Sequence, residues 1–315
     1  MTQVLSRIGA SLATIAAVSL LVFVLMGLMP GDPVDLLAAG NPNMTAADAA
    51  LLRERYGLDR PVLQRYASWA ASAAQGDLGY SRLFGLPVLD VIAPRLLNSL
   101  ILLGSALVLT LLVAIPATVH AAAKPDGALN RLLSMLALTG MSLPAFWLGL
   151  LLIGLFAVTL GWLPATAELA QPRSLILPVV TLSLGMLAGY VRHLQTAMGE
   201  ALRAEHIKTA RAKGCSQSRV LWRHAFPLAA TPLVTLILLD LGVLLGGALT
   251  IETVFAFPGM GKLLFDAVMG NDFNLALCGF FILTVCVVLA NLCADALYGW
   301  LDPRSRGDSK NGGSA

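Results

Sequence analysis

The chain has 315 residues, of which 57% are hydrophobic and only 12% are charged, and its formal net charge at pH 7 is +3. Soluble globular domains carry about 25% charged residues, so this composition excludes an ordinary soluble domain and indicates a membrane protein. The basic residues gather at the ends of apolar segments, which argues against a nucleic-acid-binding surface.

Six apolar segments are long enough to cross a bilayer, which takes about 20 mostly apolar residues. The uncharged stretch 132–167 is too long for one span, so we divide it into one helix and a loop at 161–173. The first segment is expected to be a retained helix, because "MGLMPGDP" at its end offers no small-residue cleavage site. In chain order the expected spans are 8–29, 96–123, 133–160, 174–191, 229–251 and 275–299.

Lysine and arginine residues lie in alternate connections between these segments. Positively charged loops stay on the cytoplasmic side of a membrane, so the pattern predicts six helices with both termini in the cytoplasm. The residues concerned are Arg7, Lys124, Arg131, Arg192, Arg203, Lys208, Arg211, Lys213, Arg219, Arg223, Arg304, Arg306 and Lys310.

The region between the first two spans is predicted to carry helices of its own on the external side. Thr45 and Asp48 have the spacing of a helix start, with an acid three residues after a capping hydroxyl, and this helix is expected to end at Gly57. Pro61 opens a second helix. Residues 76–79 form a turn, and the amphipathic segment 87–97 is expected to lie along the membrane surface.

A basic hairpin interrupts the apolar pattern between the fourth and fifth spans. Residues 198–213 are mostly helix formers, and Gly214 can end that helix in a left-handed conformation. Ser216 or Ser218 can cap a second helix, and Pro227 marks the entry to the next span. The pattern predicts two short helices and a tight turn that project from the membrane. The alternative is that the basic residues only hold this loop inside.

The hairpin sequence "KTARAKGCSQSRVLWRHAFP", residues 208–227, resembles the cytoplasmic coupling motif of ABC importer permeases. That motif reads Glu-Ala-Ala, three residues, Gly, nine residues, Ile-x-Leu-Pro. Here Lys208, Thr209 and Ala210 take the Glu-Ala-Ala positions, and Phe226 and Pro227 take the Leu-Pro positions. The first two positions depart from the motif, but "TARAKG" is similar to the version in the dipeptide, oligopeptide and nickel permease family.

The resemblance extends along nearly the whole chain. The stretches "MPGDP", "YGLDRP", "GDLGYS", "ETVFAFPGMGKLL" and "DALYGWLDPRSR" look like that family and occur in the same order. Each stretch alone is a weak signal, whereas all of them in register are a strong one. Importers of that family have two permease subunits. The larger external segment between the first two spans makes this chain more similar to the first-named of the two.

The resemblance implies an all-α integral membrane protein. It would have six transmembrane helices, a helical periplasmic segment after the first and a cytoplasmic coupling hairpin between the fourth and fifth. The expected parts are an N-terminal transmembrane helix (1–30), a periplasmic segment (31–95), a five-helix permease core (96–301) with the hairpin at 196–227, and a disordered cytoplasmic tail (302–315).

The resemblance also implies partners. The chain would be one of two permease subunits in the bacterial inner membrane, together with two cytoplasmic ATP-binding subunits and a periplasmic solute-binding protein. It would form half of a pathway for di- or oligopeptides, bind no cofactor and catalyse no reaction, because ATP is used by the partner subunits. Nickel or a metal chelate is the alternative cargo. A secondary transporter is an alternative of another class, which would require internal repeats and several ionisable groups in the spans.

In this interpretation the hairpin docks in a groove of an ATPase subunit. Gly214 would permit the tight turn, Ala210 and Ala212 would permit close approach, and the basic residues would pair with acidic groups or lipid headgroups. The expected coupling residues are Lys208, Thr209, Ala210, Arg211, Ala212, Lys213, Gly214, Arg219, Arg223, Phe226 and Pro227.

Asp240 lies near the centre of the fifth span, where a charge is expensive and a functional role is the first hypothesis. It would face the pathway and meet a cationic group of the substrate, or it would hold two helices together through a hydrogen bond.

Two other kinds of site are not expected. The stretch "GMGKL" fails as a phosphate loop, because Ala256 stands where glycine is needed and Leu263 where a hydroxyl would hold magnesium. The four histidines lack metal-ligand spacing, so no metal site is predicted.

Overall fold

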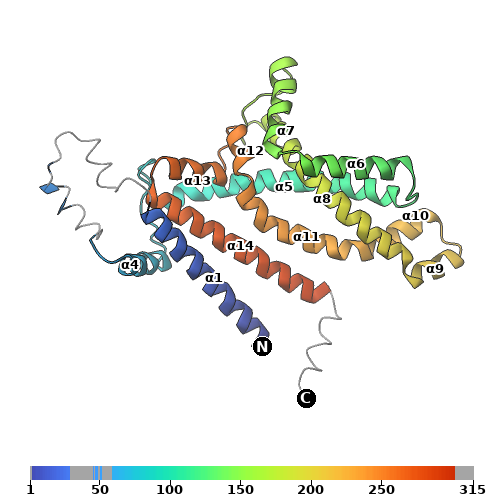
Figure 1. Cartoon of the computed structure of the whole chain (residues 1–315), viewed down its shortest axis with the longest axis horizontal. Helices are drawn as coiled ribbons and strands as arrows, with labels where there is room; N and C mark the ends of the chain where they lie inside the picture. The colour runs from blue at the N-terminus through green and yellow to red at the C-terminus, as the bar shows by residue number, and fades with distance from the viewer. Residues whose placement is uncertain (1, 29–44, 46, 49, 52–58, 302–315) are drawn as a thin grey trace. The chain divides into compact units, whose positions relative to one another are not determined.

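The computed structural model describes residues 2–28, 45, 47–48, 50–51 and 59–301. This part of the chain consists of helices joined by turns, and an isolated antiparallel bridge between Tyr80 and Pro87 is its only strand-like pairing (Figure 1). The expected helix end at Gly57 and the tail 302–315 lie outside the described residues.

Five described helices are long and apolar enough to cross a membrane, and a bent pair of helices adds a sixth candidate. This confirms an all-α membrane protein. Helices are favoured in a membrane because each helix forms hydrogen bonds between its own backbone N–H and C=O groups, where no water is present. The five are α1 (Thr2–Gly27), α5 (Val88–Ala121), α8 (Ile176–Arg203), α11 (Phe226–Gly247) and α14 (Phe273–Leu301).

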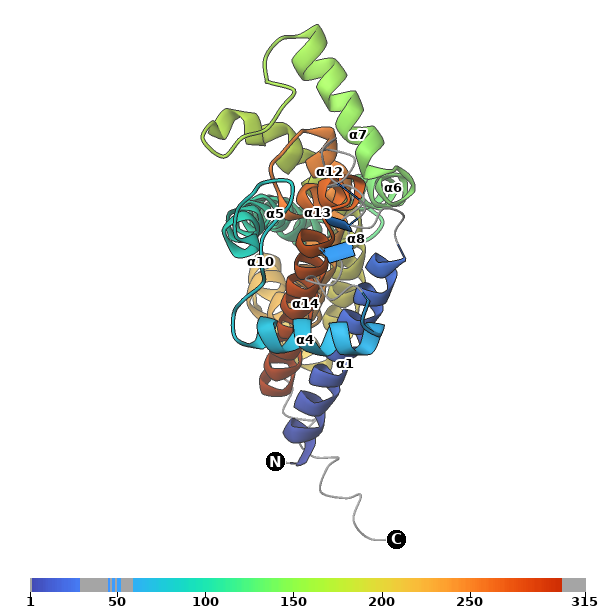
Figure 2. The same ribbon diagram turned by 90° about the vertical axis from the view of Figure 1, so that its left-hand side faces the viewer.

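The third span differs from the expected single helix at 133–160. Leu143 has an extended conformation, with φ −94° and ψ 128°, and it separates two helical pieces that meet at an angle of 102°. The reason is Pro144, because a proline ring disfavours the helical conformation of the residue before it. Figure 2 shows α7 turning away from α6. The pieces are α6 (Ala128–Ser142) and α7 (Ala145–Leu152) with η1 (Ile153–Thr159).

The second span also differs from expectation. The segment 87–97 does not form a separate surface helix but begins the continuous helix α5, which has 34 residues. At 1.5 Å per residue this helix is about 51 Å long, so it extends well beyond the hydrocarbon core of about 30 Å.

The chain divides into two compact units. The first comprises Met1–Leu97 and Lys262–Val288, and the second comprises Asn98–Gly261 and Leu289–Ala315. The first unit therefore combines segments from opposite ends of the sequence.

In the first unit, helix α4 (Val62–Ala74) packs on α1 through aromatic side chains. The Phe23 ring is buried, and it contacts Tyr66 edge to face with 5.7 Å between ring centroids. The Ser19 and Tyr66 hydroxyls share a hydrogen bond of 2.8 Å. Aromatic contacts of this kind fix α4 to the membrane helix.

The same unit holds the "GDLGYS" turn against the start of α14. Asp272 is almost fully buried, accepts hydrogen bonds from the Ser81 hydroxyl at 2.6 Å and the Leu275 N–H at 3.1 Å, and so caps α14. Gly79 has φ +71°, and a Cβ there would come within 2.7 Å of the Asn274 amide nitrogen. The turn predicted at 76–79 is therefore confirmed, and glycine is required in it.

The helix start predicted at Thr45 is also confirmed. The Thr45 hydroxyl donates to the Asp48 carboxylate at 2.6 Å, and the Asp48 N–H donates back to that hydroxyl at 3.2 Å, which is a capping box. The hydroxyl hydrogen bond lowers the pKa of the exposed Asp48 carboxyl group. Pro61 likewise precedes α4 as its N-cap residue.

In the second unit, α8 packs between α6 and α11 (Figure 1). Gly140 of α6 lies so close to Ala188 of α8 that a Cβ would approach it within 3.1 Å. The Thr110 hydroxyl of α5 reaches the Ser183 hydroxyl at 3.1 Å and also the carbonyl of its own helix at Ala106. These small and polar residues allow close helix contact inside a bilayer.

A buried carboxyl group organises the "ETVFAFPGMG" stretch of this unit. Glu252 lies in the short helix α12 (Leu249–Val254), is fully buried and accepts a hydrogen bond of 2.5 Å from the Ser99 hydroxyl. The same hydroxyl accepts the Met260 N–H at 2.7 Å, at the start of α13 (Met260–Met269). A Cβ at Gly259 would collide with the Glu252 carboxyl group. Gly259 therefore leaves the space that the Glu252 carboxyl group occupies.

We expect Ser99→Ala to destabilise the protein by about 1–3 kcal/mol, because it removes a donor from a buried carboxyl group and an acceptor from the Met260 N–H. Thermal unfolding in detergent would measure the change. The control is Ser105→Ala in the same helix, where the exposed hydroxyl donates only to the Ile101 carbonyl. Equal unfolding temperatures for the two variants would contradict this role of Ser99.

Candidate functional site

The predicted hairpin is present as a compact projection, the knob, which comprises residues 205–225. The expected fourth span at 174–191 is longer in the structure, since α8 runs on to Arg203 before Ala204 breaks the helix with ψ 146°. The knob consists of α9 (Glu205–Ala212), α10 (Gln217–Arg219) and η3 (Val220–Ala225), and η3 leads directly into α11.

Gly214 makes the turn as expected. Its φ is +75°, its N–H donates to the Arg211 carbonyl at 2.9 Å, and the Cys215 N–H donates to the Ala210 carbonyl at 3.2 Å. These two bonds form a Schellman motif, which closes a helix and needs a left-handed residue at the position of Gly214. Ser216 takes the N-cap position of α10, but its side chain makes no capping hydrogen bond.

The inner side of the knob belongs to the apolar core of the second unit. Ile207 is fully buried, and Leu221 is 6% exposed. They join one core cluster with Leu194 and Met198 of α8. The knob is therefore packed onto α8 and the start of α11 rather than attached by a loose loop.

Ala210 lies on this inner side, with 6% of its surface exposed. Its small side chain therefore serves the packing of the knob itself, and close approach of another protein at Ala210 stays a prediction. Ala212 does lie on the exposed side. A glutamate at position 210 would bury a charge, so it would test packing rather than docking.

Two contacts that the sequence did not reveal tie the knob to the end of α5. The Gln217 side-chain amide donates to the Ala123 carbonyl at 2.9 Å. The rings of Trp222 and His120 lie edge to face, 5.9 Å apart. Sequence offers no signal for either contact, since both join residues about a hundred positions apart.

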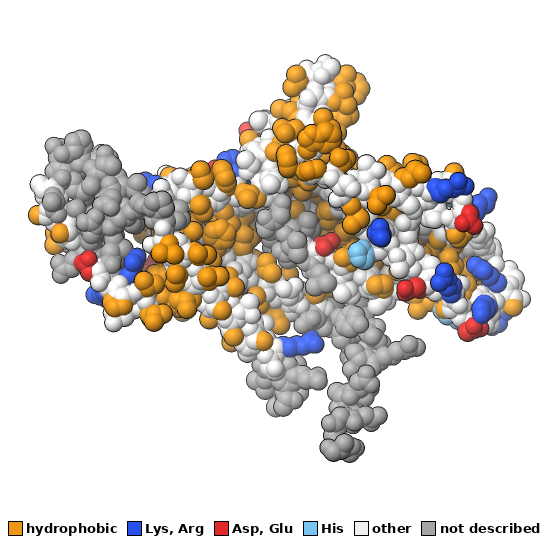
Figure 3. Space-filling model, viewed as in Figure 1, with side chains coloured by type: hydrophobic (Ala, Val, Ile, Leu, Met, Phe, Trp, Pro, Cys, Tyr) orange, Lys and Arg blue, Asp and Glu red, His pale blue; other side chains and the backbone are white. Residues whose placement is uncertain are grey.

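The outer side of the knob is basic. Figure 3 shows Lys and Arg side chains gathered over α9 and α10. Arg211, Lys213, Arg219 and Arg223 are exposed, and none of them forms an ion pair with a residue that the structure describes. This surface therefore has positive charge available for an acidic partner.

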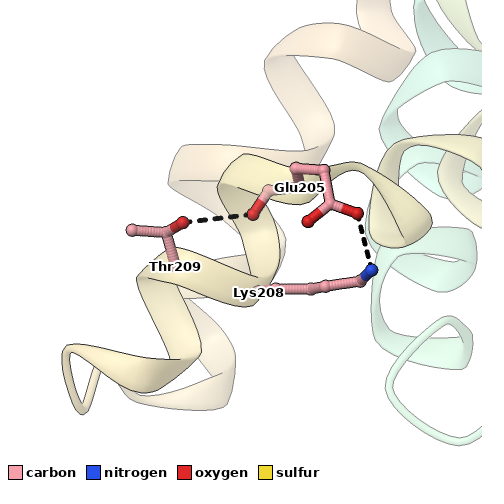
Figure 4. A network of polar contacts seen from close by, with 3 residues as sticks. All are labelled: Glu205, Lys208 and Thr209. Atoms are coloured by element: carbon pink, nitrogen blue, oxygen red, sulfur yellow. Dashed lines mark hydrogen bonds and ion pairs between the residues drawn. The ribbon is translucent and has the colours of Figure 1, made fainter.

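Lys208 and Thr209 behave differently from these four. The Lys208 ammonium contacts the Glu205 carboxylate at 2.6 Å, and the Thr209 hydroxyl donates to the Glu205 carbonyl at 3.2 Å (Figure 4). Both charged side chains are highly exposed, so this pair adds little to stability. The contacts of Glu205 with Lys208 and Thr209 all lie within the first turns of α9.

Phe226 and Pro227 begin α11. Phe226 is half-buried and lies 5.6 Å from the Trp222 ring, whereas Pro227 is exposed at the second position of α11. The two residues mark where the knob joins the membrane helix, as the sequence predicted.

Asp240 lies in α11, away from the knob. The structure places its carboxyl group beside the hydroxyl of Tyr190 in α8, a neighbour that the sequence did not suggest. Only 2% of the Tyr190 surface is exposed, and Asp240 is the group that its hydroxyl faces.

The "GMGKL" stretch has a structural role. Gly259 packs on Glu252, and Leu263 is almost fully buried. A carboxyl group at this place would repel a phosphate. In the part of the chain that the structure describes, no three His, Cys, Asp or Glu side chains lie together as metal ligands would.

Known proteins resemble this chain in sequence. Residues 111–307 match the family described as the binding-protein-dependent transport system inner membrane component. A putative peptide permease protein of Brucella suis biovar 1 is 36% identical over 310 residues, which cover 95% of this chain and 97% of the relative.

Two further relatives match this chain over a similar share of its length. The oligopeptide transport system permease protein AppB of Bacillus subtilis is 33% identical over 96% of this chain and 98% of its own length. The glutathione transport system permease protein GsiC of Escherichia coli K12 is 35% identical over 97% and 99%. The chain therefore belongs to the family of binding-protein-dependent inner membrane transport components, and it is a multi-pass permease of an ABC importer.

Proposed function

We propose that this permease carries di- or oligopeptides and forms half of their pathway through the bacterial inner membrane. The support is that relatives matched along their full length are a peptide permease, an oligopeptide permease and a glutathione permease. The chain moves its cargo without catalysing a reaction and binds no cofactor. Nickel or a metal chelate is the alternative cargo in the same family.

The proposed assembly has five parts. A second permease completes the pathway, two cytoplasmic ATP-binding subunits hydrolyse ATP, and a periplasmic binding protein delivers the solute. Both termini and the knob face the cytoplasm, as the positive charges favour. The proposed organisation is a first membrane helix (1–30), a periplasmic segment (31–95), a permease core (96–301) and a cytoplasmic tail (302–315).

In this assembly the knob docks on an ATP-binding subunit. The observation that carries this proposal is the knob itself, which is packed on its inner side, basic on its outer side and joined directly to α8 and α11. A packed element moves as a rigid body, so closure of the ATPase pair would swing both helices and open the pathway outward.

The cargo is tested by uptake in a strain that lacks this gene. We expect the strain to lose uptake of a labelled dipeptide and to regain it when the gene is restored, while uptake of labelled nickel is unchanged in both strains. Loss of nickel uptake alone would replace the peptide by the metal as cargo. If neither changed, glutathione, opines and metallophores would be measured next.

The rigid turn is tested by Gly214→Pro. We expect transport to be abolished while the protein stays in the membrane, because proline holds φ near −65° and lacks the N–H that bonds to Arg211. Uptake and the amount of protein in isolated membranes would be measured together. Gly199→Ala is the control, since a Cβ there meets nothing within 4 Å. Normal transport by the proline variant would exclude the proposed coupling role of the turn.

The basic surface is tested by Arg211→Glu. We expect the affinity for the ATP-binding subunits to fall several-fold at low salt and much less at high salt, because exposed interfacial charges mainly steer association. Co-purification at both salt concentrations would measure the effect. Arg60→Glu, which reverses an exposed charge outside the knob, is the matched control. Unchanged association in Arg211→Glu would argue against electrostatic docking.

A further inference from the structure

The knob is attached to the end of α5 as well as to α8 and α11. At and beyond the C-terminal end of a helix, backbone carbonyl groups lack a partner within the helix. The Gln217 side-chain amide donates to one such group, the Ala123 carbonyl, at 2.9 Å. This hydrogen bond joins the first residue of α10 to the segment in which the chain leaves α5.

A ring contact provides a second attachment, independent of the hydrogen bond. The Trp222 ring of η3 lies edge to face with the His120 ring of α5, and 5.9 Å separate the ring centroids. The His120 ring is held in turn, because its Nδ1 lies 2.7 Å from the Pro116 carbonyl. The Trp222 ring also packs on Phe226, with 5.6 Å between the centroids. Pairs of this kind prefer a defined geometry, so they fix position as well as burying apolar surface.

Apolar packing continues these two attachments into the membrane helix. Ala114 and Val119 of α5 belong to the same buried core cluster as Val220 and Leu221 of η3. The α5 members of this cluster lie on both sides of Pro116, the position at which a proline permits a helix to bend. The attachment of α5 to the knob therefore includes the apolar core in addition to two side-chain contacts.

These contacts matter because α5 is not continuous with the knob. The knob joins α8 and α11 through the chain itself, whereas 94 positions separate Ala123 from Gln217. In the proposed function ATP-driven closure moves the knob, and α8 and α11 follow it as parts of the same chain segment. α5 follows only through packed side chains and hydrogen bonds, which are the physical carriers of such coupling.

We propose that Gln217 and Trp222 are positioning residues that make α5 a third driven helix. They hold the end of α5 to the knob, so that α5 is displaced together with α8 and α11 during the transport cycle. This proposal rests on the proposed function, because it names a further helix that the knob moves. Without the two side chains, ATP hydrolysis still moves the knob but α5 no longer follows it fully.

The first measurement uses the reconstituted importer with all its subunits. Uptake of a labelled dipeptide and ATP hydrolysis are measured in the same vesicles, and the readout is the number of dipeptide molecules taken up per ATP hydrolysed. A variant that is merely less stable lowers both rates together and leaves this ratio unchanged.

We expect Gln217→Ala to lower this ratio about threefold, and its combination with Trp222→Ala to lower it at least about tenfold. Trp222→Phe keeps a ring beside His120 and should retain most of the wild-type ratio. Gln195→Ala is the matched control, because it removes a glutamine amide that bonds the Asn130 side chain of α6 at 2.8 Å, and it should keep the ratio. An unchanged ratio in the double variant would overturn the proposal.

The second measurement does not depend on the cargo. Ala123→Cys and Gln217→Cys are combined with Cys215→Ala, a short bismaleimide joins the two introduced thiols, and mass spectrometry gives the joined fraction. We expect the joined importer to hydrolyse ATP at the rate of the untreated variant, because two positions that move together tolerate a covalent link. Each single-cysteine variant, treated in the same way, is the control for reaction elsewhere. Arrest of ATP hydrolysis by the link, or failure of the reagent to join the two positions, would overturn the proposal.

The two measurements separate this proposal from the proposed function. An unchanged ratio in the double variant, together with loss of transport in Gly214→Pro, would overturn the link to α5 and leave the coupling role of the knob standing. No dipeptide uptake by the wild type would overturn the proposed cargo alone, because ATP hydrolysis by the cross-linked importer still decides whether α5 moves with the knob.

Discussion

Exclusion of water is the constraint on which the rest of this structure depends. In a bilayer no water is present to form hydrogen bonds with an unpaired polar group. The backbone therefore becomes helical, and polar side chains need partners within the protein. The buried carboxyl groups follow this rule. Glu252 takes the Ser99 hydroxyl, and Asp272 takes the Ser81 hydroxyl and two backbone N–H groups.

The same constraint explains polar side chains of the second unit. The Thr110 hydroxyl donates to the Ala106 carbonyl, the Thr181 hydroxyl donates to the Leu177 carbonyl, and the Ser99 hydroxyl donates to the Glu252 carboxyl group. The basic side chains on the outer side of the knob differ from these, because they form no ion pair within the described residues.

The knob combines structure and function in one element. Its inner side, with Ile207 and Leu221, continues the core of α8 and α11, so the ends of two membrane helices and the knob form a single packed body. Its outer side presents exposed arginine and lysine side chains, which in the proposed assembly face an ATP-binding subunit. Rigidity on one side and available charge on the other are what a mechanical coupling between two proteins requires.

The sequence by itself determined the membrane class, the number of apolar segments and the turn at Gly214, because these depend on composition and on local backbone preference. It also carried the family resemblance through short motifs in register. It failed where geometry depends on distant residues or on helix continuity. Pro144 broke the expected third helix, and α5 absorbed the segment that was expected on the membrane surface.

Only the tertiary structure decided which faces of these elements turn inward. Ala210 belongs to a docking motif in the sequence, and packing against α8 made it a core residue. Asp240 could be recognised as costly from its position alone. Its neighbour Tyr190 could not be found, because the contact joins two helices far apart in the sequence and side-chain burial is fixed by helix packing rather than by local sequence.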